Sequence, residues 1–214
     1  MSRSSTPALA GALMVTLALA CGKGTDPSST VVLKLNSTDS LDGWVQSNAA
    51  VFVHGGGPLV GDFPTSQPGV GYREFYSFDL GSIPASAVIT SATLRLYQQQ
   101  VGGTPYASLG NVVVDHMNFG AVLQATDYLA APLAAAIGVI SSDTAKGYKD
   151  LNVLSRVTAD IAAARGRSQF RIRFSTQDTN GDGVNDFALF TDAEMSCCNP
   201  GTTQPPHLVI AYHL

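Results

Sequence analysis

Residues Tyr72–Gln98 read YREFYSFDLGSIPASAVITSATLRLYQ, and this stretch decides the fold. Apolar and polar side chains alternate on both sides of a central turn, a period typical of strands with one buried and one solvent-facing side. Gly81 and Pro84 mark the connection between the two strands. The expected inward residues are Tyr76, Phe78, Leu80, Ala92, Leu94 and Leu96, and the outward ones are Arg73, Ser77, Asp79, Thr93, Arg95 and Tyr97.

Segments with the same alternation recur along the chain, separated by turns rich in Gly and Pro. One short helix is expected after Ser155, where Val157 and Ile161 share a face. The Ala- and Leu-rich segment 127–136 also has helical composition, although Pro132 interrupts it. This pattern predicts an all-β, antiparallel β-sandwich, with a jelly roll as the favoured topology. Further strands are expected at 31–36, 50–54, 112–117, 168–176, 186–191 and 208–212, and a loop at 59–70.

The composition favours an extracellular protein over a helical cytosolic one. Of the 214 residues 13% are charged, and the chain contains 21 Gly and 11 Pro. Low charge combined with abundant turn-forming residues is typical of secreted β-rich proteins. The formal net charge of -4 gives no basic footprint, so nucleic acid is not an expected partner. Residues 31–214 suffice for one domain with a full core.

Residues 1–20 have the pattern of a secretory signal peptide. Arg3 supplies a positive charge, and the apolar run that follows is too short to span a bilayer and ends on small residues. Cys21 comes next, and the sequence LALAC resembles a bacterial lipobox, in which the Cys becomes the lipidated first residue. Residues 21–30 then form a polar tether. We therefore expect a lipid-anchored protein of the bacterial cell envelope, with its domain outside the cytoplasm. A plain secreted protein is the alternative.

The stretch DTNGDGVND at 178–186 matches the start of a calcium-binding loop. Oxygen-bearing side chains alternate along it, and Gly183 permits the tight turn that such loops need. Leu189 occupies the position where a bidentate Glu usually completes the site. A solvated hairpin connection is the alternative, because Asn-Gly and Asp-Gly are themselves turn formers. The predicted ligands are Asp178, Asn180, Asp182, the carbonyl of Val184, and Asp186.

Two adjacent cysteines, Cys197 and Cys198, form a second unusual motif. With Cys21 lipidated they are the remaining thiols, in an oxidising compartment. A vicinal disulfide would make a strained ring whose apolar face can cover a sugar. Adjacent cysteines fit ordinary disulfide geometry poorly, so two reduced or intermolecularly paired thiols are the alternative.

Aromatic side chains supply candidates for stacking on sugar rings. Tyr97 is expected on the solvent-facing side of its strand, and Trp44 follows a turn-rich stretch. Each has an alternative interpretation as an ordinary packing residue. Tyr72, Tyr106 and Tyr148 are further aromatic candidates, to which the same alternative applies.

Catalytic motifs are scarce, and we expect no enzyme activity. The four histidines, at 54, 116, 207 and 213, lack metal-ligand spacing, and no Gly-x-Ser-x-Gly elbow or phosphate loop occurs. Glu74 and Asp79 would be a carboxylate pair for glycoside hydrolysis. Asp79, however, lies at the end of a strand pattern, where a structural hydrogen bond is the favoured role.

Three segments resemble the DNRLRE-domain group, also classed as family 96 carbohydrate-binding modules. They are the FDL, SIP and ITSATLRLY pieces of 78–97, LNV at 151–153 before the expected helix, and PHLVI at 206–210. Leu154 departs from the Thr of that pattern, and the six-residue DNRLRE signature does not occur. The resemblance implies a non-catalytic, secreted jelly roll that accompanies carbohydrate-active or surface-attached proteins. We therefore expect a surface lipoprotein that binds extracellular or cell-wall polysaccharide, with calcium steadying a loop. A structural or adhesive surface protein without a sugar site is the alternative.

Overall fold

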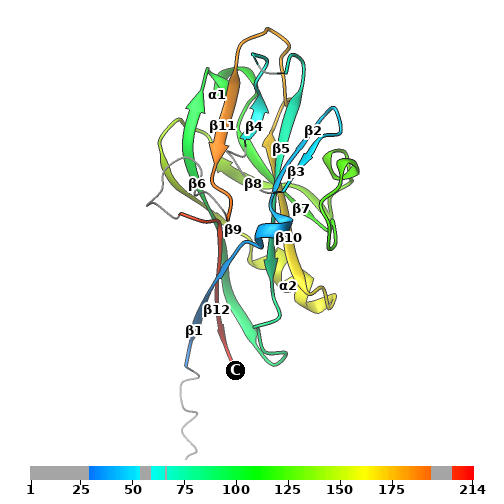
Figure 1. The fold of residues 1–214 in the computed structure, drawn as a ribbon. Coiled ribbons are helices and arrows are strands. Elements are labelled where there is room, and N and C mark those ends of the chain that lie inside the picture. Colours follow the sequence, from blue (N-terminus) through cyan, green and yellow to red (C-terminus); the bar gives the residue numbers. More distant parts are fainter. Residues whose placement is uncertain (1–28, 54–58, 66, 194–203) are drawn as a thin grey trace, which may run out of the picture.

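The computed structural model describes residues 29–53, 59–65, 67–193 and 204–214. Within these residues the strands join into one curled sheet whose ladders are antiparallel (Figure 1), which confirms the predicted all-β, sandwich-like fold. The strands are β1 (Val31–Asn36), β2 (Gly43–Gln46), β3 (Val51–Phe52), β4 (Leu59–Asp62), β5 (Gly71–Asp79), β6 (Val88–Gly102), β7 (Val112–Met117), β8 (Ala134–Ser141), β9 (Gly147–Asn152), β10 (Arg167–Phe174), β11 (Asp186–Phe190) and β12 (His207–His213). The helices are α1 (Pro105–Ser108) and α2 (Leu154–Ala162), and η1 (Asp39–Leu41) and η2 (Ala125–Tyr128) are short 3-10 turns.

The sheet folds over so that two layers face each other. Strand β6 is central to the first layer, because β12 and β11 pair along one of its edges and β9 along the other. Strands β5, β10, β7 and β8 follow one another in the second layer. Strand β4 links the layers by pairing with both β11 and β5. A jelly-roll-like sandwich therefore encloses one main core.

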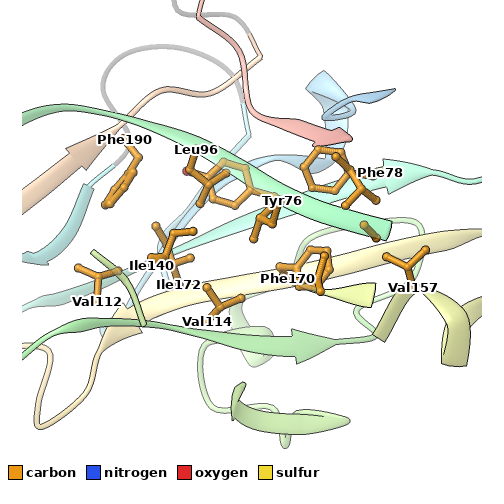
Figure 2. Close-up of a cluster of buried hydrophobic side chains, with 14 of the residues drawn as sticks. Tyr76, Phe78, Leu96, Val112, Val114, Ile140, Val157, Phe170, Ile172 and Phe190 are labelled. Atoms are coloured by element: carbon orange, nitrogen blue, oxygen red, sulfur yellow. The ribbon is translucent and has the colours of Figure 1, made fainter. Parts of the chain in front are cut away.

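The main core is built from the inward side chains of both layers. Figure 2 shows Leu96 and Phe190 of the first layer pointing into the same interior as Phe170 and Ile172 of the second. Leu94, Leu96, Phe170 and Ile172 have no exposed surface. Full burial of each such side chain contributes about 1.5–3 kcal/mol, so the period-two pattern of β6 and β10 supplies much of the stability.

The expectation that both strands of Tyr72–Gln98 have one solvent-facing side is correct for β6 and wrong for β5. Along β6, Thr93, Arg95 and Tyr97 are partly exposed. Along β5 the outward Ser77 is buried, because a second cluster packs on that face. The cluster consists of Leu41, Val45, Phe75, Met117, Phe119, Leu123 and Tyr128.

The segment 118–133, which we call the strap, covers this outer face of β5, β10 and β7. Arg171 Nη1 donates to the carbonyl oxygens of Asp127, Tyr128 and Ala130, each at 3.0 Å. The carboxylate of Asp115 holds the same guanidinium at 2.7 Å. One buried arginine therefore fixes the strap to the sheet.

Three other local expectations need correction. The helix at 127–136 does not form: η2 ends at Tyr128, Pro132 cannot continue a helix, and β8 begins at Ala134, with the amide of Ala136 donating to Asp115. The expected loop 59–70 contains β4. Helix α2 is confirmed but starts at Leu154, so Ser155 lies inside it and Val153 occupies the N-cap position. The Asn152 side chain, just before the cap, accepts from the Leu154 amide at 3.0 Å.

The two ends of the domain lie together. Val31 at the start of β1 is opposite Tyr212 near the end of β12, and Figure 1 shows both strands leaving at the same end of the molecule. None of the helices in the described part of the chain has the length and hydropathy needed to cross a bilayer.

Candidate functional site

Two tyrosines meet on the outer surface of the first layer. Tyr97 of β6 lies directly opposite Tyr148 of β9. Their ring centroids are 5.1 Å apart with an interplanar angle of 76°, the favourable edge-to-face arrangement. The two rings thus form a fixed aromatic surface, and 38% of Tyr148 is exposed.

An ion pair flanks the two rings on the same strands. Arg95 Nε lies 2.7 Å from Asp150 Oδ1, and Arg95 Nη2 lies 2.8 Å from Asp150 Oδ2. This two-bond pairing raises the pKa of Arg95, mainly through the hydrogen bond with Asp150. The guanidinium carbon also stands 5.2 Å from the centroid of the Tyr148 ring. An exposed pair adds little stability, so its interest is as a set of oriented polar groups.

A buried histidine packs against the ring of Tyr148. His207 of β12 is buried, and its ring lies 6.1 Å from that of Tyr148. Its Nδ1 is 2.9 Å from the side-chain oxygen of Asn36. Burial, with the charges of Lys34 and Arg95, lowers the pKa of His207 to about 4. The imidazole is therefore neutral at physiological pH and donates Nδ1–H to Asn36.

We call this set, Tyr97, Tyr148, Arg95, Asp150 and His207, the tyrosine face. A partly exposed ring can stack on the apolar side of a sugar, while a guanidinium and a carboxylate can bond its hydroxyls. Sequence reasoning placed Tyr97 on the solvent side but gave no preference to Tyr148. The signal that could have found it is GYKDLN at 147–152, where Tyr148 and Asp150 alternate with residues of the opposite face.

The other predicted stacking residue is less accessible. Only 8% of Trp44 is exposed, and Phe52, opposite it in β3, stacks on its ring at 4.9 Å and 12°. Phe52 itself is 38% exposed. The ring that this hairpin presents to solvent is therefore chiefly that of Phe52.

The predicted calcium loop uses several of its oxygens within the protein. Asn180 Oδ1 accepts from the amide of Asp182 at 3.1 Å, and Asp182 Oδ1 accepts from the amide of Val184 at 2.7 Å. Both oxygens of Asp186 bond to the α1 region, one to the Thr104 amide and one to Ser108 Oγ, each at 2.6 Å. Asp186 thus serves chiefly to hold α1 against β11.

Asp178 begins the loop and faces the strap. Its Oδ2 accepts from Tyr128 Oη at 2.8 Å and lies 2.8 Å from Arg73 Nη2. Among the described residues, no group of three or more His, Cys, Asp or Glu side chains gathers closely enough to hold a metal ion by itself. Calcium therefore remains a prediction, whose ligands would include carbonyl, amide or water oxygens.

The carboxylates considered for catalysis are not brought together. Glu74 is buried in the main core region, where it accepts from Tyr76 Oη, and burial raises its pKa. Asp79 lies five residues further along β5, on the opposite face, and accepts from the amide of Gly81 at 2.8 Å. Each has the structural role expected of a carboxylate in its position.

Sequence reasoning missed one buried polar cluster because its members come from three elements. Asp160 of α2 accepts from Ser168 Oγ at 2.6 Å and lies 2.9 Å from His116 Nε2. Arg165 Nη1 reaches the same carboxylate at 3.1 Å. Asp160, Ser168 and His116 are each at most 2% exposed, so their contacts tie α2 to β7 and β10.

Two surface hollows lie away from the tyrosine face. One of about 440 Å³ is at the end of the strap and the other, of about 330 Å³, is between the strap and β2. The lining residues are Asp79, Gly81, Asn118, Gly120, Ala121, Arg165, Gly166, Arg167 and Gln169 for the first, and Gln46, Ser47, Ala49, Ala125, Thr126, Tyr128, Leu129 and Ala130 for the second. The first contains polar side chains but has no aromatic lining residue, so it offers hydrogen bonds without a stacking surface.

The predicted lipidation site Cys21 and the pair Cys197 and Cys198 lie outside the described residues. Compared with known proteins, the chain matches neither a family model nor a curated protein sequence.

Proposed function

We propose that this protein is a non-catalytic surface lipoprotein of the bacterial envelope whose domain binds extracellular or cell-wall polysaccharide. The observation that carries the proposal is the tyrosine face. There an exposed ring stands beside a two-bond Arg95–Asp150 pair on a rigid sheet. Aromatic rings flanked by oriented polar groups are well suited to sugars, which have both apolar and hydroxyl-bearing sides.

The position of this surface along β6 suits a membrane-tethered receptor. Val88 of β6 pairs with His213 at the end where β1 begins, and Tyr97 lies nine residues further along the strand. At about 3.3 Å per residue, the tyrosine face stands about 30 Å from the tethered end. Lipid attached at Cys21 would therefore leave it free to meet polymers outside the cell.

The resemblance to DNRLRE domains supports the same proposal. The segments that carry it lie at the end of β5, in β6, at the end of β9 before α2, and in β12, all around the main core. They bear on the fold more than on the ligand, so the choice of sugar depends on the tyrosine face. Calcium, bound at the loop 178–186, would steady the loop between β10 and β11.

A glycan array tests the proposal directly. The full chain with Cys21→Ser, which cannot be lipidated, is screened against neutral and acidic polysaccharides with and without calcium. We expect binding that Tyr148→Ala reduces about tenfold, because a stacked aromatic ring contributes about 0.5–1.5 kcal/mol beyond its buried area, and about 1.4 kcal/mol is a factor of ten. Phe52→Ala removes an equally exposed ring from another hairpin and is the matched control.

Failure of this screen has a definite meaning. If no polysaccharide binds, the proposal is wrong, and the alternative of a structural or adhesive surface protein takes its place. If Phe52→Ala abolishes binding and Tyr148→Ala does not, sugar recognition belongs to the β2–β3 hairpin rather than to the tyrosine face.

A further inference from the structure

Two carboxylates, one beside each end of the loop 178–186, carry a buried oxygen without a hydrogen-bond partner. These atoms are Asp62 Oδ2 and Asp178 Oδ1. Asp62 is 1% exposed, and the side chain of Asp178 is 10% exposed. The second oxygen of each is occupied: Asp62 Oδ1 accepts from the Asp186 amide at 3.0 Å, and Asp178 Oδ2 bonds Tyr128 and Arg73. Both oxygens thus lack the compensation that a buried carboxylate requires.

The sheet register brings these two side chains to the same place. Asp62 of β4 lies directly opposite Gly71 of β5, and directly opposite residues project to the same face with Cβ positions about 5 Å apart. A Cβ built on Gly71 would lie only 2.6 Å from the Cβ of Asp178. Asp178 therefore fills the space that a side chain at residue 71 would take, next to Asp62. The Cβ atoms of the two aspartates are within about 8 Å.

That separation suits two carboxylates that share one cation. Calcium binds oxygens at about 2.3–2.6 Å, so an ion between two aspartates holds their Cβ atoms about 8 Å apart. Within the described residues, Arg73 is the cation in contact with this pair, and it reaches Oδ2 of Asp178 rather than either unpartnered oxygen. The two free oxygens are hard ligands, which favour Ca²⁺ over softer metals.

We propose that calcium binds between Asp62 and Asp178, with Asp62 supplying from β4 the carboxylate that Leu189 does not provide at the end of the loop. The inference rests on the calcium part of the proposed function and changes its ligand set. Asp186 is excluded as a principal ligand because Thr104 and Ser108 use both of its oxygens. Loop oxygens and water complete the shell.

Terbium luminescence tests this assignment without any glycan. Tb³⁺ substitutes for Ca²⁺ and emits when a nearby tyrosine is excited, and Tyr128 Oη lies 2.8 Å from Asp178 Oδ2. With the full Cys21→Ser chain we expect saturable emission that calcium displaces. Asp62→Asn and, separately, Asp178→Asn should each weaken binding at least tenfold. Asp143→Asn removes an exposed carboxylate from the segment before β9 and should leave the titration unchanged.

Each outcome separates the proposals. If calcium displaces the emission equally from the parent, Asp62→Asn and Asp178→Asn, this inference is wrong. If terbium binding is lost in Asp182→Asn instead, the site belongs to the loop alone. No calcium-displaced emission from the parent overturns both this inference and the calcium part of the proposed function. Polysaccharide binding is decided by the array and stands or fails independently. Melting temperature in chelator shows whether each variant folds, and one folded Asp variant with parental affinity is enough to refute the assignment.

Discussion

Asp42 should make the folded protein less stable as the pH rises. It is 3% exposed and accepts from Ser37 Oγ at 2.6 Å and from the Ala193 amide at 2.9 Å. Burial, reinforced by the negative charges of Asp192 and Asp39, raises its pKa from 3.8 to about 7. The ionised form is therefore disfavoured in the folded state relative to the unfolded chain.

The sign and size of the effect follow from the two pKa values. The folded protein holds the proton more tightly, so the contribution of Asp42 to the free energy of unfolding is greatest below pH 4 and falls until about pH 7. At about 1.4 kcal/mol for each pKa unit, the loss reaches about 4 kcal/mol. Both bonds that Asp42 accepts go to Oδ2, so the amide oxygen of Asp42→Asn can take both; the variant abolishes the loss, and burying its NH₂ group costs about 1 kcal/mol. The variant should be about 3 kcal/mol more stable than the parent at pH 8, and no more stable at pH 4.

Urea unfolding of parent and variant at each pH measures this difference. His207 contributes the opposite slope: its pKa of about 4 means that stability falls as the pH drops below about 6.5. Because both chains contain His207, subtraction removes its contribution. Asp150→Asn, at an exposed carboxylate, is the control and should run parallel to the parent. A stability difference between Asp42→Asn and the parent that is the same at pH 4 and pH 8 would refute the reasoning.

Three further predictions concern the core, the strap and the amino terminus. Leu94→Ala should lower the free energy of unfolding by about 3 kcal/mol, since this side chain is fully buried between the layers; a loss below 1 kcal/mol in urea unfolding would contradict that packing. Arg171→Leu should cost about 2–3 kcal/mol, because the strap carbonyls lose a buried donor while Arg173 still pairs with Asp115, and limited proteolysis should then cut the strap first. Cys21→Ser should move the protein from the membrane to the soluble envelope fraction, and unchanged membrane recovery would exclude lipidation at this residue.

The period-two pattern predicted the fold well where one layer packs on one core. In β6 the alternation of Leu94 and Leu96 with Arg95 and Tyr97 corresponds directly to inside and outside. In β5 the same pattern is misleading at Ser77, because alternation shows which face is polar but not whether a distant segment covers it. The strap that does so is held by long-range bonds from Arg171, which have no local signature.

The candidate site was only partly predictable for the same reason. The alternation within its own strand places Tyr97 on the solvent-facing side. Its partner Tyr148 lies 51 positions later and contacts it only through the β6–β9 register. Trp44 is covered by Phe52 through a hairpin pairing that composition does not indicate. The loop 178–186 was recognisable, but Asp62 comes from a segment expected to be a loop. Local pattern thus identifies single residues, and pairing between strands decides which of them act together.

The pairing of the first and last strands has a mechanical consequence. When a load on the ligand-bearing surface is resisted at the amino-terminal end, the pull runs along β1, from Val31 toward Asn36. Its hydrogen bonds to β12 then bear the load in parallel, as in shear, instead of opening one after another like a zipper. Detachment of β1 requires the whole ladder to yield at once, so a chain fixed at that end should resist stretching better than one pulled from the middle of the sheet.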